Sequence, residues 1–225
     1  MTGELGPKRL QLLHELLPKA ARFGVLEDPA NPVTPSLISD LQTAARALGL
    51  QLVLVNARTD SDLETHFAIF SQRHVDAVLV GTSNFYNRRM EQLAALAARY
   101  ALPAIFPWRE FALAGGLMSY GTSLGYAYHQ LGIYTGRILK GEKPADLPIE
   151  QITRIELTIN LKTAKALGLT IPETLLATAD EGIHETPDVH RGARKRGGMA
   201  GGGAGAAAEA AGDWNPEFRT SAARW

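Results

Sequence analysis

The chain contains no cysteine among its 225 residues, which excludes thiol catalysis, disulfides and thiolate metal sites. It also lacks any apolar run near the roughly 20 residues that a membrane-spanning helix needs. No charge of one sign predominates, because 23 Lys and Arg balance 23 Asp and Glu, so nucleic acid or an anionic membrane is not favoured. With 45% hydrophobic residues, the composition is that of a globular protein of one or two domains.

Enzyme signatures are absent as well. No G-x-G-x-x-G motif follows an apolar run, and the sequence has no phosphate-binding loop. The six histidines show no metal-ligand spacing, and none follows a predicted strand, where a Ser-His-Asp arrangement would need one. We therefore expect no catalysis, no metal ion and no cofactor.

Five short runs rich in Val, Ile and Leu recur in the first half of the chain. They do not alternate with polar residues, which is typical of strands buried on both faces of a parallel sheet. The runs are "RFGVLED" (22–28), "LQLVLVNA" (50–57), "VDAVLVGT" (75–82), "LPAIFPW" (102–108) and "GLMSYGT" (116–122). Helical patterns separate them, and this alternation predicts an α/β fold with a doubly wound parallel sheet.

The predicted helices between these runs carry recognisable start signals. The second helix begins near Ser61, which is spaced with Glu64 as a capping box. The third begins near Ser83 or Asn84, and either side chain could cap it.

The rhythm of the sequence changes after residue 122. Residues 123–140 predict a long helix with one inward-facing apolar stripe. The stripe consists of Leu124, Tyr128, Leu131, Thr135 and Ile138. Residues 155–161, "IELTINL", predict a strand, and Asn160 caps the short helix that follows. One strand and two helices cannot form a sheet with its own core, so this segment either lacks a packing partner or joins the first unit.

Residues 184–225 differ in composition from the rest of the chain. They are rich in Gly, Ala and Arg and contain few large aliphatic residues. Such a segment cannot offset the entropy of ordering itself, so we predict that it is disordered. The run "RGARKRGG" has the composition of a nucleic-acid patch, but a short basic run in a flexible tail is more often incidental, and we expect no nucleic-acid partner.

Polar and aromatic residues follow the first five predicted strands. In open α/β sheets, ligands bind outside the carboxyl ends of the strands, so these side chains are expected to form one site. The predicted ligand-binding residues are Asp28, Asn31, Thr82, Ser83, Asn84, Phe85, Trp108, Arg109, Tyr120 and Thr122. The aromatic side chains would enclose the apolar part of the ligand, and the others would hold its polar groups.

Each candidate also has an ordinary structural role. Ser83 or Asn84 caps a helix, and Asp28 stands where a turn is expected. In the alternative interpretation, Trp108 would only pack at the edge of the sheet, and Arg109 and Glu110 would only form a solvated ion pair. These roles do not explain why hydroxyl, amide and aromatic groups gather at the same end of every strand.

Longer stretches of the chain resemble a known family. They are "AIFPWREFALAGGLMSYGTS", "YAYHQLGIYTGRILKGEKPADLPIEQ" and "ELTINLKTAKALGLTIPETLLATADE", together with "GPKRLQLLHELLPKA" and "VDAVLVG". Together they resemble the substrate-binding proteins of ABC transporters, in the group described as the tryptophan or tyrosine uptake type. The resemblance covers residues 4 to 181.

The resemblance implies a type I periplasmic-binding fold, in which crossover strands join two α/β lobes and a small solute lies in the cleft between them. By this resemblance, residues 4–121 form an α/β ligand-binding lobe. Residues 122–183 form the crossover and part of the remaining lobe, and residues 184–225 form the disordered tail.

The family also implies a function. We expect the solute-binding component of an ABC-type uptake transporter, which binds a small organic solute such as an amino acid and works with a membrane permease. A ligand-sensing domain of a regulator or receptor with the same fold is the alternative, although the N-terminus shows no helix-turn-helix.

The family places such proteins in the periplasm or on a lipid anchor outside the cytoplasm. Its members begin with an export signal and most of the first lobe. Here the N-terminus "MTGELGPKRLQLLHELLPKA" has no apolar signal-peptide core. We interpret the sequence as a truncated form, which would be cytoplasmic if expressed as written.

Overall fold

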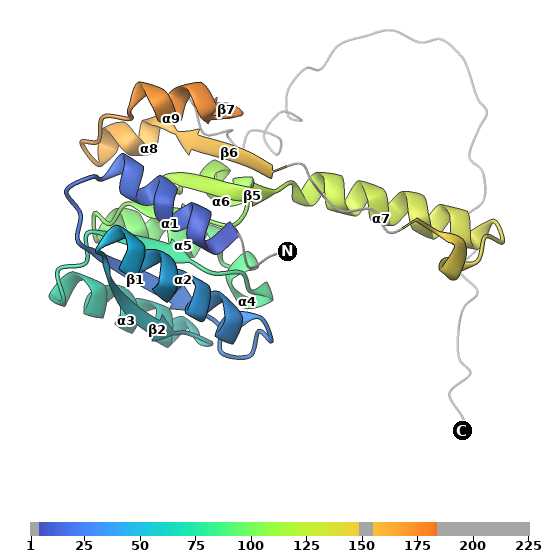
Figure 1. Cartoon of the computed structure of the whole chain (residues 1–225), viewed down its shortest axis with the longest axis horizontal. Helices are drawn as coiled ribbons and strands as arrows, with labels where there is room; N and C mark the ends of the chain where they lie inside the picture. The colour runs from blue at the N-terminus through green and yellow to red at the C-terminus, as the bar shows by residue number, and fades with distance from the viewer. Residues whose placement is uncertain (1–4, 149–154, 184–225) are drawn as a thin grey trace, which may run out of the picture. The chain divides into compact units, whose positions relative to one another are not determined.

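The computed structural model describes residues 5–148 and 155–183. Within these ranges, seven strands form a single sheet in the order β2-β1-β3-β4-β5-β6-β7. The strands are β1 (Arg22–Glu27), β2 (Gln51–Asn56), β3 (Ala77–Val80), β4 (Ala104–Phe106), β5 (Met118–Thr122), β6 (Ile155–Asn160) and β7 (Glu181–Ile183). Figure 1 shows how they lie relative to the helices.

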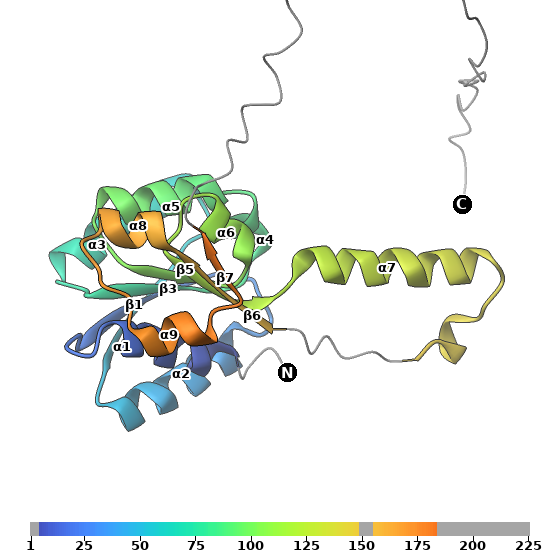
Figure 2. The same ribbon diagram turned by 90° about the horizontal axis from the view of Figure 1, so that it is seen from above.

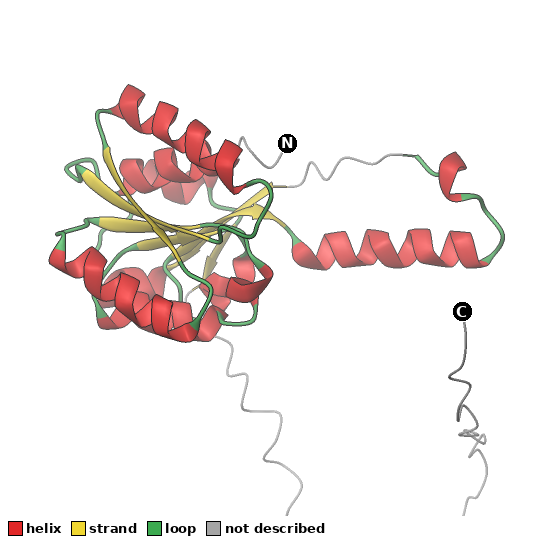
Figure 3. Cartoon of the chain, turned by 90° about the horizontal axis from the view of Figure 1, so that it is seen from below, coloured by secondary structure: helices red, strands yellow, loops and turns green. Residues whose placement is uncertain are grey.

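Helices cover both faces of this sheet. The helices of the described ranges are α1 (Leu5–Leu16), α2 (Thr34–Leu48), α3 (Asp60–Gln72), α4 (Asn84–Asn87), α5 (Met90–Arg99), α6 (Arg109–Leu113), α7 (Leu124–Leu139), α8 (Leu161–Ala166) and α9 (Glu173–Thr178), with a 3-10 turn at Pro144–Asp146, and α7 extends away from the sheet. Helices α1, α2 and α9 lie on one face, and α3, α5 and α6 lie on the other (Figures 2 and 3). No helix of the described ranges is long and apolar enough to cross a lipid bilayer.

The first five strands are parallel, as the apolar runs predict. Strand β1 pairs with β2 and β3, β3 pairs with β4, and β4 pairs with β5. All residues of β3 and β4 are buried, which confirms the expectation of strands covered on both faces. Strand β2 departs from it, because it lies at the edge of the sheet and leaves Leu54 38% exposed.

The sixth strand continues the same sheet in the opposite direction. Strand β6 is antiparallel to β5, with Thr122 opposite Ile155 and Met118 opposite Ile159. Strand β7 then pairs parallel to β6. Residues 155–183 therefore join the first unit, because the edge of β5 offers them unpaired backbone groups. This corrects the expectation that this part of residues 122–183 belongs to another lobe, and the remaining boundaries of the predicted parts stay predictions.

Two helix starts also differ from the expected ones. The capping box of α3 uses Thr59 and Asp62 in place of Ser61 and Glu64. The Asp62 N–H donates to the Thr59 hydroxyl at 3.1 Å, and the Asp62 carboxylate accepts the Thr59 N–H at 2.9 Å. The expected third helix is divided into α4 and α5, and Ser83 caps α4 by accepting the Phe85 N–H at 3.0 Å.

Helix α7 does not bury the stripe that its spacing predicts. No side chain of α7 is buried, and Tyr128 and Leu131 are 69% and 61% exposed. The inward orientation expected for this stripe is therefore wrong for the described residues, because a helix buries an apolar face only where another element packs against it. The tail predicted for residues 184–225 lies outside the described residues.

Candidate functional site

The carboxyl ends of β1 and β3 border a cavity. These strands are neighbours, with Leu26 opposite Val80, so the loops that follow them lie side by side. The cavity has a volume of about 350 Å³ and is lined by Asp28, Ala30, Asn31, Pro32, Thr82, Ser83 and Asn84. Five of the ten predicted ligand-binding residues therefore share one cavity at the expected edge of the sheet.

Asp28 fixes one wall of this cavity. Its side-chain oxygen Oδ1 accepts the Ala30 N–H at 2.9 Å, and Oδ2 accepts the Ser83 hydroxyl at 2.5 Å. The Arg58 guanidinium lies 3.6 Å from Oδ1 and adds a partly exposed ion pair. Both oxygens of Asp28 are thus engaged within the protein, and the carboxylate joins the loop after β1 to the loop after β3.

Asn31 makes the second link between the two loops. Its Nδ2 donates to the Thr82 carbonyl at 2.6 Å, and its Oδ1 accepts the Val33 N–H at 3.2 Å. The buried Thr34 hydroxyl donates to the Asp28 carbonyl at 2.8 Å. These bonds hold the cavity wall in one conformation. Binding a ligand therefore costs less conformational entropy of the two loops.

The two aromatic candidates, Phe85 of α4 and Trp108 before α6, contact the core. Phe85 and Trp108 pack, half-buried, against the apolar cluster on the α3 and α5 face. The Arg89 guanidinium stacks 3.9 Å above the Phe85 ring, and the Trp108 indole donates to Asn87 Oδ1 at 3.0 Å. Neither side chain lines the cavity, although Phe85 directly follows Asn84, which does.

The last three candidates lie apart from the cavity. Arg109 donates to Glu181 of β7 at 2.6 Å. Tyr120 packs half-buried against the apolar cluster on the α1 and α2 face, and Thr122 pairs with Ile155 in the sheet. A ligand role for these three residues stays a prediction.

A buried carboxylate that the sequence analysis missed lies next to the cavity wall. Glu27, the last residue of β1, is 1% exposed, and neither of its carboxylate oxygens has a hydrogen-bond partner within the described residues. Burial raises the pKa of Glu27 from its ordinary 4.5 to about 7, although the charge of Arg9 opposes this rise. The available signal was a charged residue at the end of an otherwise apolar strand.

Arg9 of α1 supplies the opposing charge. Its side chain is buried, and its Nε donates to the Tyr120 carbonyl at 2.7 Å. Burial lowers the pKa of Arg9 to about 10, so the guanidinium stays charged near neutral pH. A buried carboxyl group at the end of β1 and a buried guanidinium hydrogen-bonded to β5 therefore interact electrostatically beneath α1.

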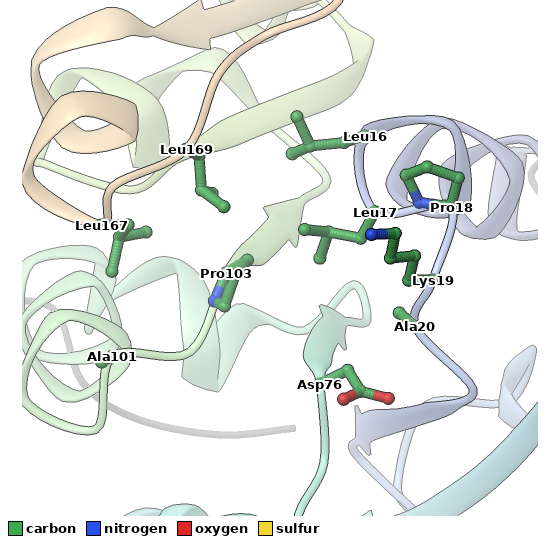
Figure 4. Close-up of a pocket in the computed structure, with 10 residues that line it drawn as sticks. All are labelled: Leu16, Leu17, Pro18, Lys19, Ala20, Asp76, Ala101, Pro103, Leu167 and Leu169. Carbon is green, nitrogen blue, oxygen red and sulfur yellow. The ribbon is translucent and has the colours of Figure 1, made fainter.

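A larger cavity of about 540 Å³ lies at the opposite edge of the sheet (Figure 4). Leu16 and Leu17 border it on one side, and Leu167 and Leu169 border it on the other. Its one carboxylate, Asp76, already accepts the N–H groups of Ala21 and Arg22 at 2.9 Å each. This cavity lies at the amino ends of the strands and offers few free polar groups, so it is the weaker candidate.

Comparison with known proteins identifies the family. Residues 4–183 match the sequence profile of the ABC transporter substrate-binding proteins. The chain belongs to this family. The resemblance noted in the sequence is thereby confirmed, and the family is one of solute-binding proteins and not of enzymes.

Relatives and solved structures agree with this family. A tyrosine-binding protein of Clostridioides difficile is 25% identical over 165 residues, which cover 72% of this chain and 47% of that protein. A conserved domain protein from Vibrio cholerae has a TM-score of 0.70 at 25% identity, with 79% of this chain and 60% of that chain covered. An ABC domain in complex with L-Trp from Streptococcus pneumonia has a TM-score of 0.67 at 23% identity, with 80% and 62% covered. The chain thus spans about half to three-fifths of the length of these proteins.

Proposed function

We propose that this chain binds an amino acid at the carboxyl edge of its sheet, as the solute-binding component of an ABC-type uptake transporter. The cavity between the loops after β1 and β3 carries this proposal. Support comes from two similar proteins, one named for tyrosine binding and one solved with L-Trp. The proposal includes a membrane permease as partner and a site of action outside the cytoplasm.

The free polar groups of the cavity suit the backbone atoms of an amino acid. The side chains of Thr82 and Asn84 donate no hydrogen bond to the rest of the described chain. Those of Asp28 and Asn31 form hydrogen bonds between the loop after β1 and the loop after β3. A hydroxyl and an amide can each donate to a carboxylate and accept from an N–H group. Thr82 and Asn84 would therefore contact the solute, while Asp28 and Asn31 hold the wall in place.

The aromatic side chains of Phe85, in α4, and Trp108 would contact the solute's side chain. Phe85 follows Asn84 directly, and Trp108 is hydrogen-bonded to Asn87 at the other end of the same short helix. An aromatic amino acid placed over Asn84 would reach this surface and gain from ring contacts. No feature of the described residues favours a regulator's ligand-sensing domain over this function.

Isothermal titration calorimetry with L-tyrosine, L-tryptophan, L-leucine and L-aspartate tests the proposal. We expect saturable binding of an aromatic member, and we expect Thr82→Val to weaken it because valine keeps the shape of threonine without the hydroxyl. Thr43→Val, on the exposed side of α2, is the matched control and should bind as the unaltered chain does. Absence of binding for every panel member at millimolar concentration would contradict the proposal.

A further inference from the structure

The two edges of the sheet differ in how well they are protected from pairing with another chain. Within the described residues, β7 borders one edge and β2 borders the other (Figure 1). Strand β7 has three residues, and the first of them, Glu181, is charged and pairs with Arg109. A short edge strand and a charged side chain both discourage a further strand from pairing. The β7 edge therefore carries the usual protection.

Strand β2 has neither kind of protection. It runs for six residues, Gln51–Asn56, and contains no charged residue, proline or glycine. Its register with β1 is continuous over all six residues, so no bulge bends the strand. Leu54, near its middle, is 38% exposed. A regular, uncharged and apolar edge of this length is the kind that pairs with another chain.

The hydrogen bonds at the two ends of β2 show which of its residues bind β1. The Gln51 N–H donates to the Ala21 carbonyl at 2.8 Å, and the Ala57 N–H donates to the Glu27 carbonyl at 3.1 Å. Successive residues of a strand direct their backbone groups to opposite sides, and β2 is paired with β1 throughout. The odd-numbered residues of β2 therefore bind β1, and the even-numbered residues face away from it.

The outward-facing residues of β2 are Leu52, Leu54 and Asn56. Their N–H and C=O groups have no neighbouring strand within the described residues. Leu52 packs against the apolar cluster on the α1 and α2 face, and Val53 and Val55 pack against the cluster on the α3 and α5 face. The strand is thus fixed between two layers, and only its edge is open.

A second copy of this chain fits the open edge. Where a two-fold axis relates two identical antiparallel strands, one residue lies opposite itself. Leu54 is the central outward-facing residue, so its N–H and C=O would bond with Leu54 of the second copy, and Leu52 would lie opposite Asn56. On the other face, Val53 would lie opposite Val55, and such β-branched pairs stabilise paired strands. None of these pairs brings like charges together.

We propose that the edge of β2 is a self-association surface, at which two copies of this chain pair their β2 strands antiparallel about Leu54 and form one continuous sheet. The contact is closed, because it uses the β2 edge of both copies and leaves only the protected β7 edges open among the described residues. The inference goes beyond the proposed function and does not depend on it, since no residue of β2 lines the cavity at the carboxyl edge.

Hydrogen exchange of backbone amides tests this pairing in the unaltered chain. The amides of Leu52, Leu54 and Asn56 should exchange more slowly as the protein concentration rises over about a 100-fold range, because pairing protects them. The amides of Val53 and Val55 should exchange slowly at every concentration, because they face β1. If exchange of the Leu54 amide does not depend on concentration, the proposal is overturned.

Sedimentation equilibrium measures the association itself. Leu54→Lys should raise the dissociation constant of the dimer by at least about 10-fold, because two lysines would face each other across the two-fold axis. Leu131→Lys is the matched control, because Leu131 is a 61% exposed leucine on α7, the other exposed apolar surface. This control should leave the dissociation constant unchanged.

Two sedimentation results would also overturn the proposal. One is a chain that stays monomeric at every concentration. The other is an association that Leu131→Lys abolishes and Leu54→Lys leaves intact, since α7 would then hold the copies together. Because the exchange measurement uses the unaltered chain, it decides the question even if Leu54→Lys does not fold. Neither experiment uses a solute, so failure of the proposed function in calorimetry would leave this inference standing.

Discussion

Replacing Glu27 with glutamine should change how the stability of this protein depends on pH. The folded chain raises the pKa of Glu27 from 4.5 to about 7, so between these values the folded state binds a proton that the unfolded state has released. The free energy of unfolding therefore falls as the pH rises through this window. The difference between 4.5 and about 7 corresponds to about 3 kcal/mol, because one pKa unit is worth about 1.4 kcal/mol. Glutamine cannot ionise, so the variant should lose this decline.

Urea unfolding followed by circular dichroism, at pH values of about 5 and about 8, measures the effect. The fall in stability between the two pH values should be smaller in Glu27→Gln than in the unaltered chain by about 3 kcal/mol. Glu64→Gln, which alters an exposed carboxylate paired with Arg99, should keep the full fall. If Glu27→Gln shows the same decline with pH as the unaltered chain, Glu27 is not the buried, unpartnered group that the structure shows.

Two further substitutions test the neighbours of Glu27. Gly81→Ala should lower the free energy of unfolding by about 1 to 3 kcal/mol, because its Cβ overlaps the Glu27 carboxylate, and the combined change with Glu27→Ala should restore part of that loss in urea unfolding. An equal loss in both backgrounds would contradict this overlap. Asp28→Asn should also lower the free energy of unfolding by about 1 to 3 kcal/mol. Asparagine has one side-chain oxygen, so it can accept from the Ala30 N–H or from the Ser83 hydroxyl but not from each with a separate oxygen. Unchanged thermal unfolding of this variant would contradict the role of Asp28.

The sheet and the cavity could be predicted because they depend on local patterns. Uninterrupted apolar runs are typical of strands covered on both faces, and they located all five parallel strands, although β2 lies at the edge of the sheet and is partly exposed. Parallel strands then bring their carboxyl ends to one edge, so Asp28 and Thr82 were expected together and share a cavity.

Contacts between distant segments could not be predicted from these patterns. The pairing of β6 with β5 depends on which edge of the sheet is free, and the apolar run of residues 155–161 does not specify its neighbour. Arg109 finds its partner in Glu181, which lies at the far end of the described chain.

Glu27 was missed for the same reason. The pKa of Glu27 depends on its burial and on the charge of Arg9, and its position depends on the space left by Gly81; Arg9 and Gly81 lie in parts of the sequence far from each other. A strand pattern marks the position of a residue along the sheet but not whether its polar atoms find partners.

The most direct test of the account is a map of where an amino acid binds. In ¹⁵N-labelled protein titrated with L-tyrosine, backbone amide signals of residues 28–31 and 82–84, which line the cavity at the carboxyl edge, should shift together and saturate. Signals from the cavity at the opposite edge, such as those of Leu17 and Leu169, should stay in place. Shifts confined to that opposite cavity, or no saturable shift at all, would contradict the claim that this chain binds its solute at the carboxyl ends of β1 and β3.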